Sequence, residues 1–288
     1  MIFEELNITH KLLPMLQNFE SLVLIWLALG LITFIVLLKI PAPYGKFSKT
    51  NWGPMISSEF GWFIMEIISP IALIYFFLNG DIEKTSTNIT FITFWALHYF
   101  NRSVFYPLRQ NNPAKMPLII AVLAFLFNVI NGYVNGTYLG SIQDYSAEYM
   151  SNWNFIFGIC LFIIGAYINI KSDNILLSLR SKSGEYKIPE GFMFRYVSFP
   201  NYLGEIIEWS GWAIATWSLP GTLFALGAVG CIGVRSIHTH KWYKDCFKDY
   251  GMVTDSSGKY SAIWRPYHYI GLELAQSVYS IALDNRAT

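Results

Sequence analysis

Seven stretches of the chain are apolar over close to the length that a helix needs to cross a bilayer, which is about 20 residues. They are residues 21–38, 61–79, 88–106, 117–134, 153–170, 203–217 and 219–234. The first, fourth, fifth and seventh stretches contain no charged residue. The pattern predicts an all-α fold, an integral membrane bundle of seven transmembrane helices. The polar stretch 171–200 is then a long loop between the fifth and sixth helices.

The basic residues agree with this count. If the N-terminus lies outside and the helices alternate, every Lys and Arg except Lys11 and Lys84 falls on the inner side. An excess of basic residues in cytoplasmic loops is the usual pattern of membrane proteins. We therefore expect the N-terminus outside or lumenal and the C-terminus in the cytosol. The membrane is the bacterial inner membrane or that of the endoplasmic reticulum, depending on the source.

Composition points the same way, because 53% of the residues are hydrophobic and only 14% are charged. Soluble proteins carry about 25% charged residues. We find no internal repeat and expect one membrane domain over residues 1–288, with a polar tail at 251–288. The net charge of +1 gives no reason to expect a nucleic acid partner. The three cysteines are scattered, so neither a disulfide framework nor a metal site is expected.

Five ionisable residues lie inside the predicted helices: Glu66, His98, Arg102, Glu205 and Glu208. Such a residue costs about 2.5–3.5 kcal/mol at the centre of a membrane helix, so it is a candidate for function. Arg102 lies near the cytoplasmic end of its helix and its long side chain can reach the interface. Glu66 is too short for that, which makes it the stronger candidate.

Polar residues also repeat at helical spacing, so that each set shares one face. The three sets are Asn169, Asp173 and Arg180; Asn201, Glu205 and Glu208; and Arg235, His238, Thr239 and Trp242. All fall in the predicted cytoplasmic half. The sets favour a cavity that binds a polar ligand such as a nucleotide, with capping and hydrogen bonds between helices as the alternative.

Common cofactor and metal motifs are missing, since no GxGxxG follows a strand-like stretch and no HExxH or CxxC occurs. Gly227, Gly230 and Gly233 lie on a membrane helix and predict close helix packing. His238 and His240 point to different faces of a helix, so no metal site is expected there.

Several motifs in order resemble the steroid 5α-reductase family over residues 44–250. They read INIKSD at 168–173, NYLGEIIEW at 201–209, ATWSLP at 215–220, HKWY at 240–243, WFIME at 62–66 and LHYFNR at 97–102. The resemblance implies a seven-helix fold that binds NADPH in its cytosolic half. It also implies hydride transfer to the Δ4 double bond of a 3-oxo-Δ4 steroid.

Position by position, the resemblance makes Glu66 and Tyr99 the catalytic pair that holds the 3-keto oxygen. It places the cofactor on Arg102, Asn169, Asp173, Arg180, Tyr186, Asn201, Glu205, Arg235, His240 and Tyr243. It places the substrate pocket at Trp62, Gly227 and Cys231. A Tyr hydroxyl would stabilise the enolate that hydride addition creates. Glu66 would either donate a second hydrogen bond when protonated or orient Tyr99 when ionised.

The sequence departs from the family at two places that bear on function. Thr239 stands where relatives have a histidine, and Gly227 and Cys231 stand where steroid-specific relatives often have phenylalanines. A reductase of another lipid enone or enal, such as a polyprenal or an enoyl thioester, is therefore an alternative. A membrane methyltransferase of the isoprenylcysteine type is a second. The expected partners are a steroid-like small molecule and membrane lipids, with the chain acting as a monomer.

Overall fold

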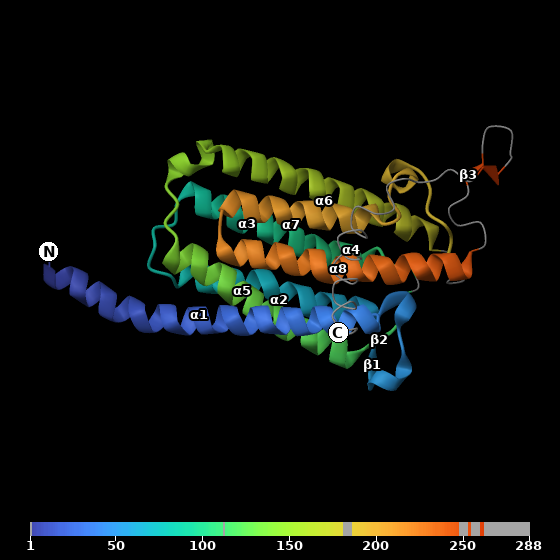
Figure 1. The fold of residues 1–288 in the computed structure, drawn as a ribbon, viewed down its shortest axis with the longest axis horizontal. Coiled ribbons are helices and arrows are strands. Elements are labelled where there is room, and N and C mark those ends of the chain that lie inside the picture. Colours follow the sequence, from blue (N-terminus) through green and yellow to red (C-terminus); the bar gives the residue numbers. More distant parts are fainter. Residues whose placement is uncertain (1, 112, 181–185, 248–252, 255–259, 262–288) are drawn as a thin grey trace, which may run out of the picture. The chain divides into compact units, whose positions relative to one another are not determined.

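The computed structural model describes residues 2–111, 113–180, 186–247, 253–254 and 260–261. The described chain is mainly helical, as predicted (Figure 1). Its α-helices are α1 (Ile2–Lys39), α2 (Ser58–Leu78), α3 (Ser86–Phe100), α4 (Tyr106–Leu108), α5 (Leu118–Thr137), α6 (Trp153–Leu179), α7 (Pro200–Thr216) and α8 (Leu219–Cys246). Most of the predicted tail at 251–288 lies outside the described residues.

Five of these helices are long and apolar enough to cross a membrane. The candidate spans are Phe19–Lys39, Ser58–Leu78, Leu118–Ile142, Trp153–Leu179 and Leu219–Cys246. The other two predicted stretches also form helices, but α3 has 15 residues and α7 has 17. An all-α membrane protein is thus confirmed, while the count of seven spans stays a prediction.

The chain forms two compact units. The first contains Met1–Thr33, Pro43–Leu108 and Lys115–Asn152, and the second contains Phe34–Ala42, Arg109–Ala114 and Trp153–Thr288. In the first unit α2 packs along α5, and in the second α7 packs against both α6 and α8 (Figure 1). The expectation of one membrane domain over residues 1–288 stays a prediction.

Glycines on α5 bring it close to α2 in the first unit. Gly132 and Gly136 on α5 and Gly140 in the π-helical turn after it repeat every fourth residue, which is the spacing that allows two membrane helices to approach. A Cβ atom at Gly136 would lie 2.5 Å from the carbonyl oxygen of Leu73, so no larger residue fits there without a shift. This close contact lets the polar side chains of α5 reach α2.

Two short paired strands lie immediately before α2 and α5. β1 (Met55–Ile56) pairs antiparallel with β2 (Met116–Pro117), with Ile56 opposite Met116. The strands precede α2 and α5 directly, and the Ser57 hydroxyl caps α2 by accepting from the backbone N–H of Phe60. Met116 is fully buried and packs with Trp62, Met65 and Ala121.

α3 begins with a capping box, because the side chains of Thr85 and Asn88 each accept from the other's backbone N–H. It continues after Phe100 into a π-helical turn, η3 (Asn101–Phe105), and then into α4. The sequence predicted this helix over 88–106 but not the π turn, which often marks a functional site.

In the second unit α6 and α7 meet through glycines spaced seven residues apart. Gly158 and Gly165 on α6 face the backbone of α7, and Gly204 and Gly211 on α7 face the backbone of α6. A Cβ atom at Gly204 would lie 2.5 Å from the backbone nitrogen of Asn169. The spacing keeps each pair on one face of its helix over two turns.

Two sequence-based expectations about this unit were wrong. The loop predicted to begin at residue 171 begins only after Leu179, because α6 continues beyond its apolar part. Gly227 and Gly233 do not pack closely, since no described atom lies within 4 Å of a Cβ built at either position. The three described atoms nearest to a Cβ built at Gly230 belong to the ring of Phe34, the first at 3.1 Å. The close contacts are made instead by the glycines of α6 and α7.

α8 is longer than a bilayer is thick. Its 28 residues rise about 42 Å, against a hydrocarbon core of about 30 Å. The extra length carries the polar set from Arg235 to Trp242 beyond the apolar part of the helix. Ser218 caps its start by accepting from the backbone N–H of Gly221.

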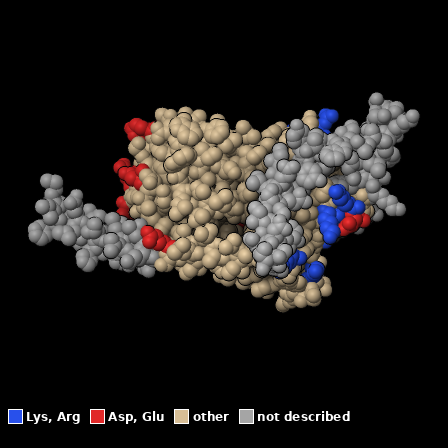
Figure 2. All heavy atoms as spheres, viewed as in Figure 1, with Lys and Arg blue, Asp and Glu red and all other residues tan. Residues whose placement is uncertain are grey.

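Lys and Arg are more frequent at one end of the helices than at the other within each unit, although the signs are mixed. In the first unit Lys46 and Lys49 precede α2, whereas Asp81, Glu83 and one base, Lys84, follow it. In the second unit Lys187 and Arg195 lie with Glu190 in the α6–α7 connection and Lys241 and Lys244 with Asp245 near the end of α8, whereas the α7–α8 turn is uncharged. Figure 2 shows red Asp and Glu directly beside the largest group of blue Lys and Arg, and further red residues without blue neighbours.

Candidate functional site

The predicted catalytic pair lies in the first unit, where one asparagine joins its two members. Nδ2 of Asn128 lies 3.5 Å from Oε2 of Glu66, and the hydroxyl of Tyr99 donates to Oδ1 of Asn128 at 3.5 Å. The three residues come from α2, α3 and α5. Tyr99 and Asn128 are buried and Glu66 is half-buried. The structure thus places Glu66 and Tyr99 at either end of one amide group.

A second asparagine contacts the same hydroxyl. Nδ2 of Asn131 donates to the Tyr99 oxygen at 3.2 Å, and Asn135 donates in turn to Oδ1 of Asn131 at 3.0 Å. Sequence reasoning missed these asparagines because it looked for ionisable residues within the predicted helices and for polar sets only in the predicted cytoplasmic half. The signal was there, since Asn128, Asn131 and Asn135 lie at i, i+3 and i+7 in an uncharged helix.

The ring of Tyr99 is held by its neighbours on α3. Its centroid lies 5.2 Å from that of Trp95 and 5.1 Å from that of His98. Trp95 is itself fixed, because its indole nitrogen donates to Oγ of Ser69 on α2 at 3.2 Å. The position of the hydroxyl is therefore set by packing as well as by hydrogen bonds.

Arg102 lies on the π turn after α3, over two aromatic rings. Its guanidinium carbon is 5.0 Å from the ring centroid of Trp62 and 5.0 Å from that of Tyr106. Such contacts attract a cation to the face of a ring. Trp62, a predicted pocket residue, also meets Tyr44 edge-on. The first unit thus brings Arg102 and Trp62 together.

The second unit holds most of the predicted cofactor residues. Asn169 on α6 donates to the backbone oxygen of Asn201 at 2.9 Å, and Nδ2 of Asn201 donates to Oδ1 of Asp173 at 3.1 Å. All three side chains are buried. Glu205 and the buried Glu208 follow on α7, one and two turns after Asn201. The glycine contacts between α6 and α7 make this approach possible.

The end of α6 is connected to α8 by aromatic contacts. A terminal nitrogen of Arg180 donates to the hydroxyl of Tyr186 at 3.1 Å, and its guanidinium also lies over the same ring. Tyr186 meets Trp242 edge-on with a centroid distance of 5.0 Å. The next residue, Tyr243, is buried beside the ring of Phe199.

The polar face of α8 contacts the segment of α1 that belongs to the same unit. Nε of Arg235 donates to the hydroxyl of Tyr202 at 3.1 Å and a terminal nitrogen lies 3.4 Å from the backbone oxygen of Ala42. Nε2 of His238 lies 2.8 Å from the backbone oxygen of Leu37. His240, by contrast, pairs with Oγ of Ser198 through Nδ1 at 3.3 Å.

Several buried polar atoms of the second unit have no hydrogen-bond partner among the described residues. They include Oγ of Ser172, Nε of Arg180, Oδ1 of Asn201 and Oγ1 of Thr239. An unsatisfied buried polar group costs about 1–3 kcal/mol, so a ligand that supplies partners is favoured. Both donors and acceptors are present, which fits a dinucleotide with its amide, hydroxyl and phosphate groups. Sequence reasoning had not named Ser172.

Gly227 and Cys231 lie one turn apart on α8. Gly227 is exposed, with no described atom within 4 Å of a Cβ built there, and Cys231 is half-buried. Of the predicted site residues, Glu66, Tyr99, Arg102 and Trp62 therefore belong to the first unit and the rest to the second.

Comparisons with known proteins decide the family. Residues 114–253 match the model of the 3-oxo-5-alpha-steroid 4-dehydrogenase family. The chain is 39% identical to the steroid 5-alpha-reductase DET2 of Gossypium hirsutum over 77% of its own length and 88% of that protein. It is 35% identical to the 3-oxo-5-alpha-steroid 4-dehydrogenase 1 of Rattus norvegicus, over 77% and 87% of the two chains. The chain belongs to this family.

Membership in the 3-oxo-5-alpha-steroid 4-dehydrogenase family confirms the prediction from the motifs and the class of enzyme, an oxidoreductase acting on CH–CH groups. The matched residues 114–253 include the polar positions from Asn169 to Tyr243 and the three asparagines of α5. Glu66, Tyr99 and Arg102 precede this range.

Proposed function

We propose that the protein reduces the Δ4 double bond of 3-oxo-Δ4 steroids to 5α-steroids with NADPH. The observation that carries the proposal is the hydrogen-bonded connection from Glu66 through Asn128 to Tyr99. A carboxyl group and a phenol joined in this way, within a largely apolar helical unit, suit a ketone that arrives from the lipid. Membership in the reductase family agrees with this substrate class.

Tyr99 and Glu66 are the residues that would hold the 3-keto oxygen. Addition of hydride to the β-carbon of an enone moves negative charge to that oxygen. A hydroxyl aimed at the oxygen stabilises the charge in the transition state, and removing such a donor typically costs about 2.7–4 kcal/mol. The bond from Tyr99 to Asn128 is long at 3.5 Å and hence weak, so the hydroxyl can turn to a ketone at little cost.

NADPH would be held by the polar residues of the second unit, and the assignment of Arg102 to the cofactor stays a prediction from the motifs. The residues of the second unit are Asn169, Asp173, Arg180, Tyr186, Asn201, Glu205, Arg235, His240 and Tyr243, and the unpartnered atoms of Ser172, Asn201 and Thr239 support a ligand among them. Arg180 and Arg235 are suited to phosphates, including the 2′-phosphate that distinguishes NADPH from NADH. When bound, NADPH supplies the hydride.

For the membrane, we propose seven spans with the N-terminus outside or lumenal and the C-terminus in the cytosol. The two short helices, α3 and α7, are then spans as well. The gathering of Lys187, Arg195, Lys241 and Lys244 near the cytosolic ends of α6, α7 and α8 supports this orientation. The membrane is the bacterial inner membrane or the endoplasmic reticulum, and the chain acts as a monomer.

The open space beside Gly227 favours a second candidate substrate. A Gly at this position leaves room for a molecule that differs from a steroid in shape. A polyprenal or an enoyl thioester also places a carbonyl next to a double bond, and the same pair of residues could hold it. This alternative changes the substrate but neither the cofactor nor the roles of Tyr99 and Glu66.

The test is turnover by the purified full-length protein in detergent with NADPH. We expect loss of the enone absorbance of testosterone or progesterone together with oxidation of NADPH. Turnover of a polyprenal or an enoyl thioester alone would establish the second candidate. Thermal stabilisation by S-adenosylmethionine, with none by NADPH, would point instead to a methyltransferase and overturn both candidates.

A further inference from the structure

The asparagines of α5 and the hydroxyl of Tyr99 form a chain of hydrogen bonds in which each residue donates to the next. Asn135 donates to Oδ1 of Asn131 at 3.0 Å, and Asn131 donates to the Tyr99 oxygen at 3.2 Å. Tyr99 donates to Oδ1 of Asn128 at 3.5 Å. Because an amide has one donor end and one acceptor end, the direction of each bond depends on how the amide is turned.

The other partners of Asn128 and Asn131 fix how each of these amides is turned. Nδ2 of Asn128 donates to the backbone oxygen of Met65 at 2.6 Å, so its Oδ1 faces Tyr99. Oδ1 of Asn131 accepts from Asn135, so its Nδ2 faces Tyr99. The phenol oxygen therefore accepts from Asn131 while its hydrogen points toward Asn128. All three asparagines are buried, where a polar group without a partner is costly.

The two bonds to the hydroxyl have different consequences for reduction of a ketone. The bond to Asn128 must be given up when the hydroxyl turns to the ketone oxygen. The bond from Asn131 can remain, because it uses a lone pair of the phenol oxygen. A donor on that oxygen stabilises the negative charge that grows there as the hydroxyl donates, and so strengthens the donation.

We propose that Asn131 is a positioning residue for Tyr99, oriented by Asn135, and that it strengthens the hydrogen bond from Tyr99 to the ketone. The inference rests on the proposed function, because it assumes that Tyr99 acts on a carbonyl. A purely structural role for Asn131 would require only that its amide be satisfied. Replacing the donor of Asn131 by an acceptor should lower kcat if Asn131 has the positioning role, and should leave kcat unchanged if its role is purely structural.

The first experiment replaces the donor by a group whose donating ability depends on pH. In Asn131→Asp the side chain donates when protonated and only accepts when ionised. We expect the kcat of N131D relative to wild type to fall at least about tenfold as pH rises through the titration of the new carboxyl, with the KM for NADPH unchanged. The control Asn152→Asp makes the same change at an exposed asparagine and should give a flat ratio.

The second experiment removes the donor altogether. Asn131→Leu keeps much of the volume, and kcat should fall about 10- to 100-fold, the effect of one hydrogen bond to a group that carries charge. A kcat within about twofold of wild type in N131L, or a flat pH ratio in N131D, would overturn the inference. If N131L does not fold, the pH profile of N131D still decides.

A third measurement keeps this inference separate from the proposed function. Tyrosines labelled with ¹³C at Cζ report hydrogen bonding to the phenol oxygen by NMR, and Tyr99→Phe identifies the Tyr99 signal. N131L should shift that signal and N152D should not. If wild type reduces no enone, the proposed function fails while the shift still tests the contact. If the signal does not move, the contact is absent and the inference fails.

Discussion

Nδ2 of Asn201 donates a hydrogen bond to Oδ1 of Asp173 at 3.1 Å, and both side chains are buried between α6 and α7. Oδ1 of the same asparagine has no partner among the described residues. Asp173 thus holds the amide with its acceptor end left available. In the proposed enzyme that acceptor would receive a hydrogen bond from NADPH.

Asp173→Ala should therefore weaken NADPH binding as well as the fold. The lost partner leaves a buried amide donor unsatisfied, which costs about 1–3 kcal/mol of stability. The amide also becomes free to turn, so the affinity for NADPH should fall by at least about tenfold. Thermal unfolding with and without NADPH measures both effects. The exposed Asp245→Ala is the control, and equal NADPH stabilisation in the two variants would contradict the prediction.

The sequence predicted the positions of the helices better than their contacts. Apolar length located α2, α5, α6 and α8 to within a few residues at their starts. The apolar stretch ends at 234, twelve residues before α8 ends at Cys246, and the helical spacing of Arg235 to Trp242 had indicated most of this continuation. The π turn at Asn101–Phe105 has no signal in hydrophobicity.

The residues of the candidate site were also predicted only in part. The motifs named Glu66 and Tyr99, but Asn128, which joins them, is an uncharged residue in an apolar helix and was overlooked. Gly227 and Gly233 were expected to pack closely, whereas Gly204 and Gly211 do. Glycine spacing alone does not say which face of a helix meets a neighbour, and only the structure supplies that face.

Tyr99→Phe should reduce kcat by about 10²–10³, the usual effect of removing one donor to a developing oxyanion. The ring remains beside Trp95 and His98, so NADPH binding should be unchanged, while the buried asparagines that lose the hydroxyl should lower stability by about 1–3 kcal/mol. Steady-state kinetics with an enone and an NADPH titration separate the two. Tyr75→Phe, at an exposed position of α2, is the matched control. A Y99F rate close to that of wild type would remove Tyr99 from the chemistry.

Gly211→Ala should destabilise the second unit. A Cβ atom there would lie 2.5 Å from the backbone oxygen of Gly158, so α6 and α7 must move apart. Overpacking of this kind typically costs about 1–3 kcal/mol. Gly30→Ala, where no described atom lies within 4 Å of the new Cβ, should gain stability because Ala favours a helix. Opposite shifts of the unfolding temperature are expected, and equal shifts would contradict close packing at Gly211.

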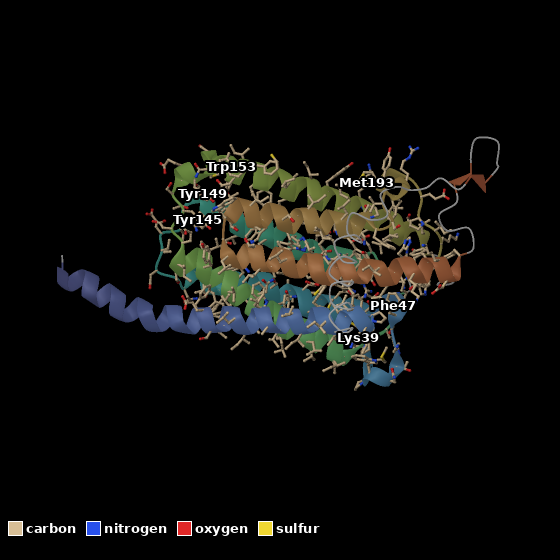
Figure 3. The ribbon with its side chains drawn as sticks, in the orientation of Figure 1. Lys39, Phe47, Tyr145, Tyr149, Trp153 and Met193 are labelled. Atoms are coloured by element: carbon tan, nitrogen blue, oxygen red, sulfur yellow. The ribbon has the colours of Figure 1, made fainter. Side chains whose placement is uncertain are left out.

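Stability at alkaline pH should depend on Tyr145, which lies outside the helices of the first unit. It is buried with its ring 4.8 Å from that of Tyr149 (Figure 3). Burial raises the pKa of Tyr145 well above its usual value, and the neighbouring Tyr138 and Tyr149 add to the effect. Folded Tyr145 therefore keeps its proton after the unfolded chain has lost it.

The direction of the pH effect on stability depends on whether the folded or the unfolded state binds the Tyr145 proton more tightly. Tyr145 contributes its full stabilisation below the unfolded pKa of about 10 and loses it as pH rises from there toward the higher folded pKa. The unfolding temperature of wild type should thus drop more steeply above about pH 10 than that of Tyr145→Phe, which has no proton to lose. Tyr196→Phe, at an exposed position, should keep the steep drop of wild type. Parallel curves for wild type and Y145F would show that this phenol does not govern alkaline unfolding.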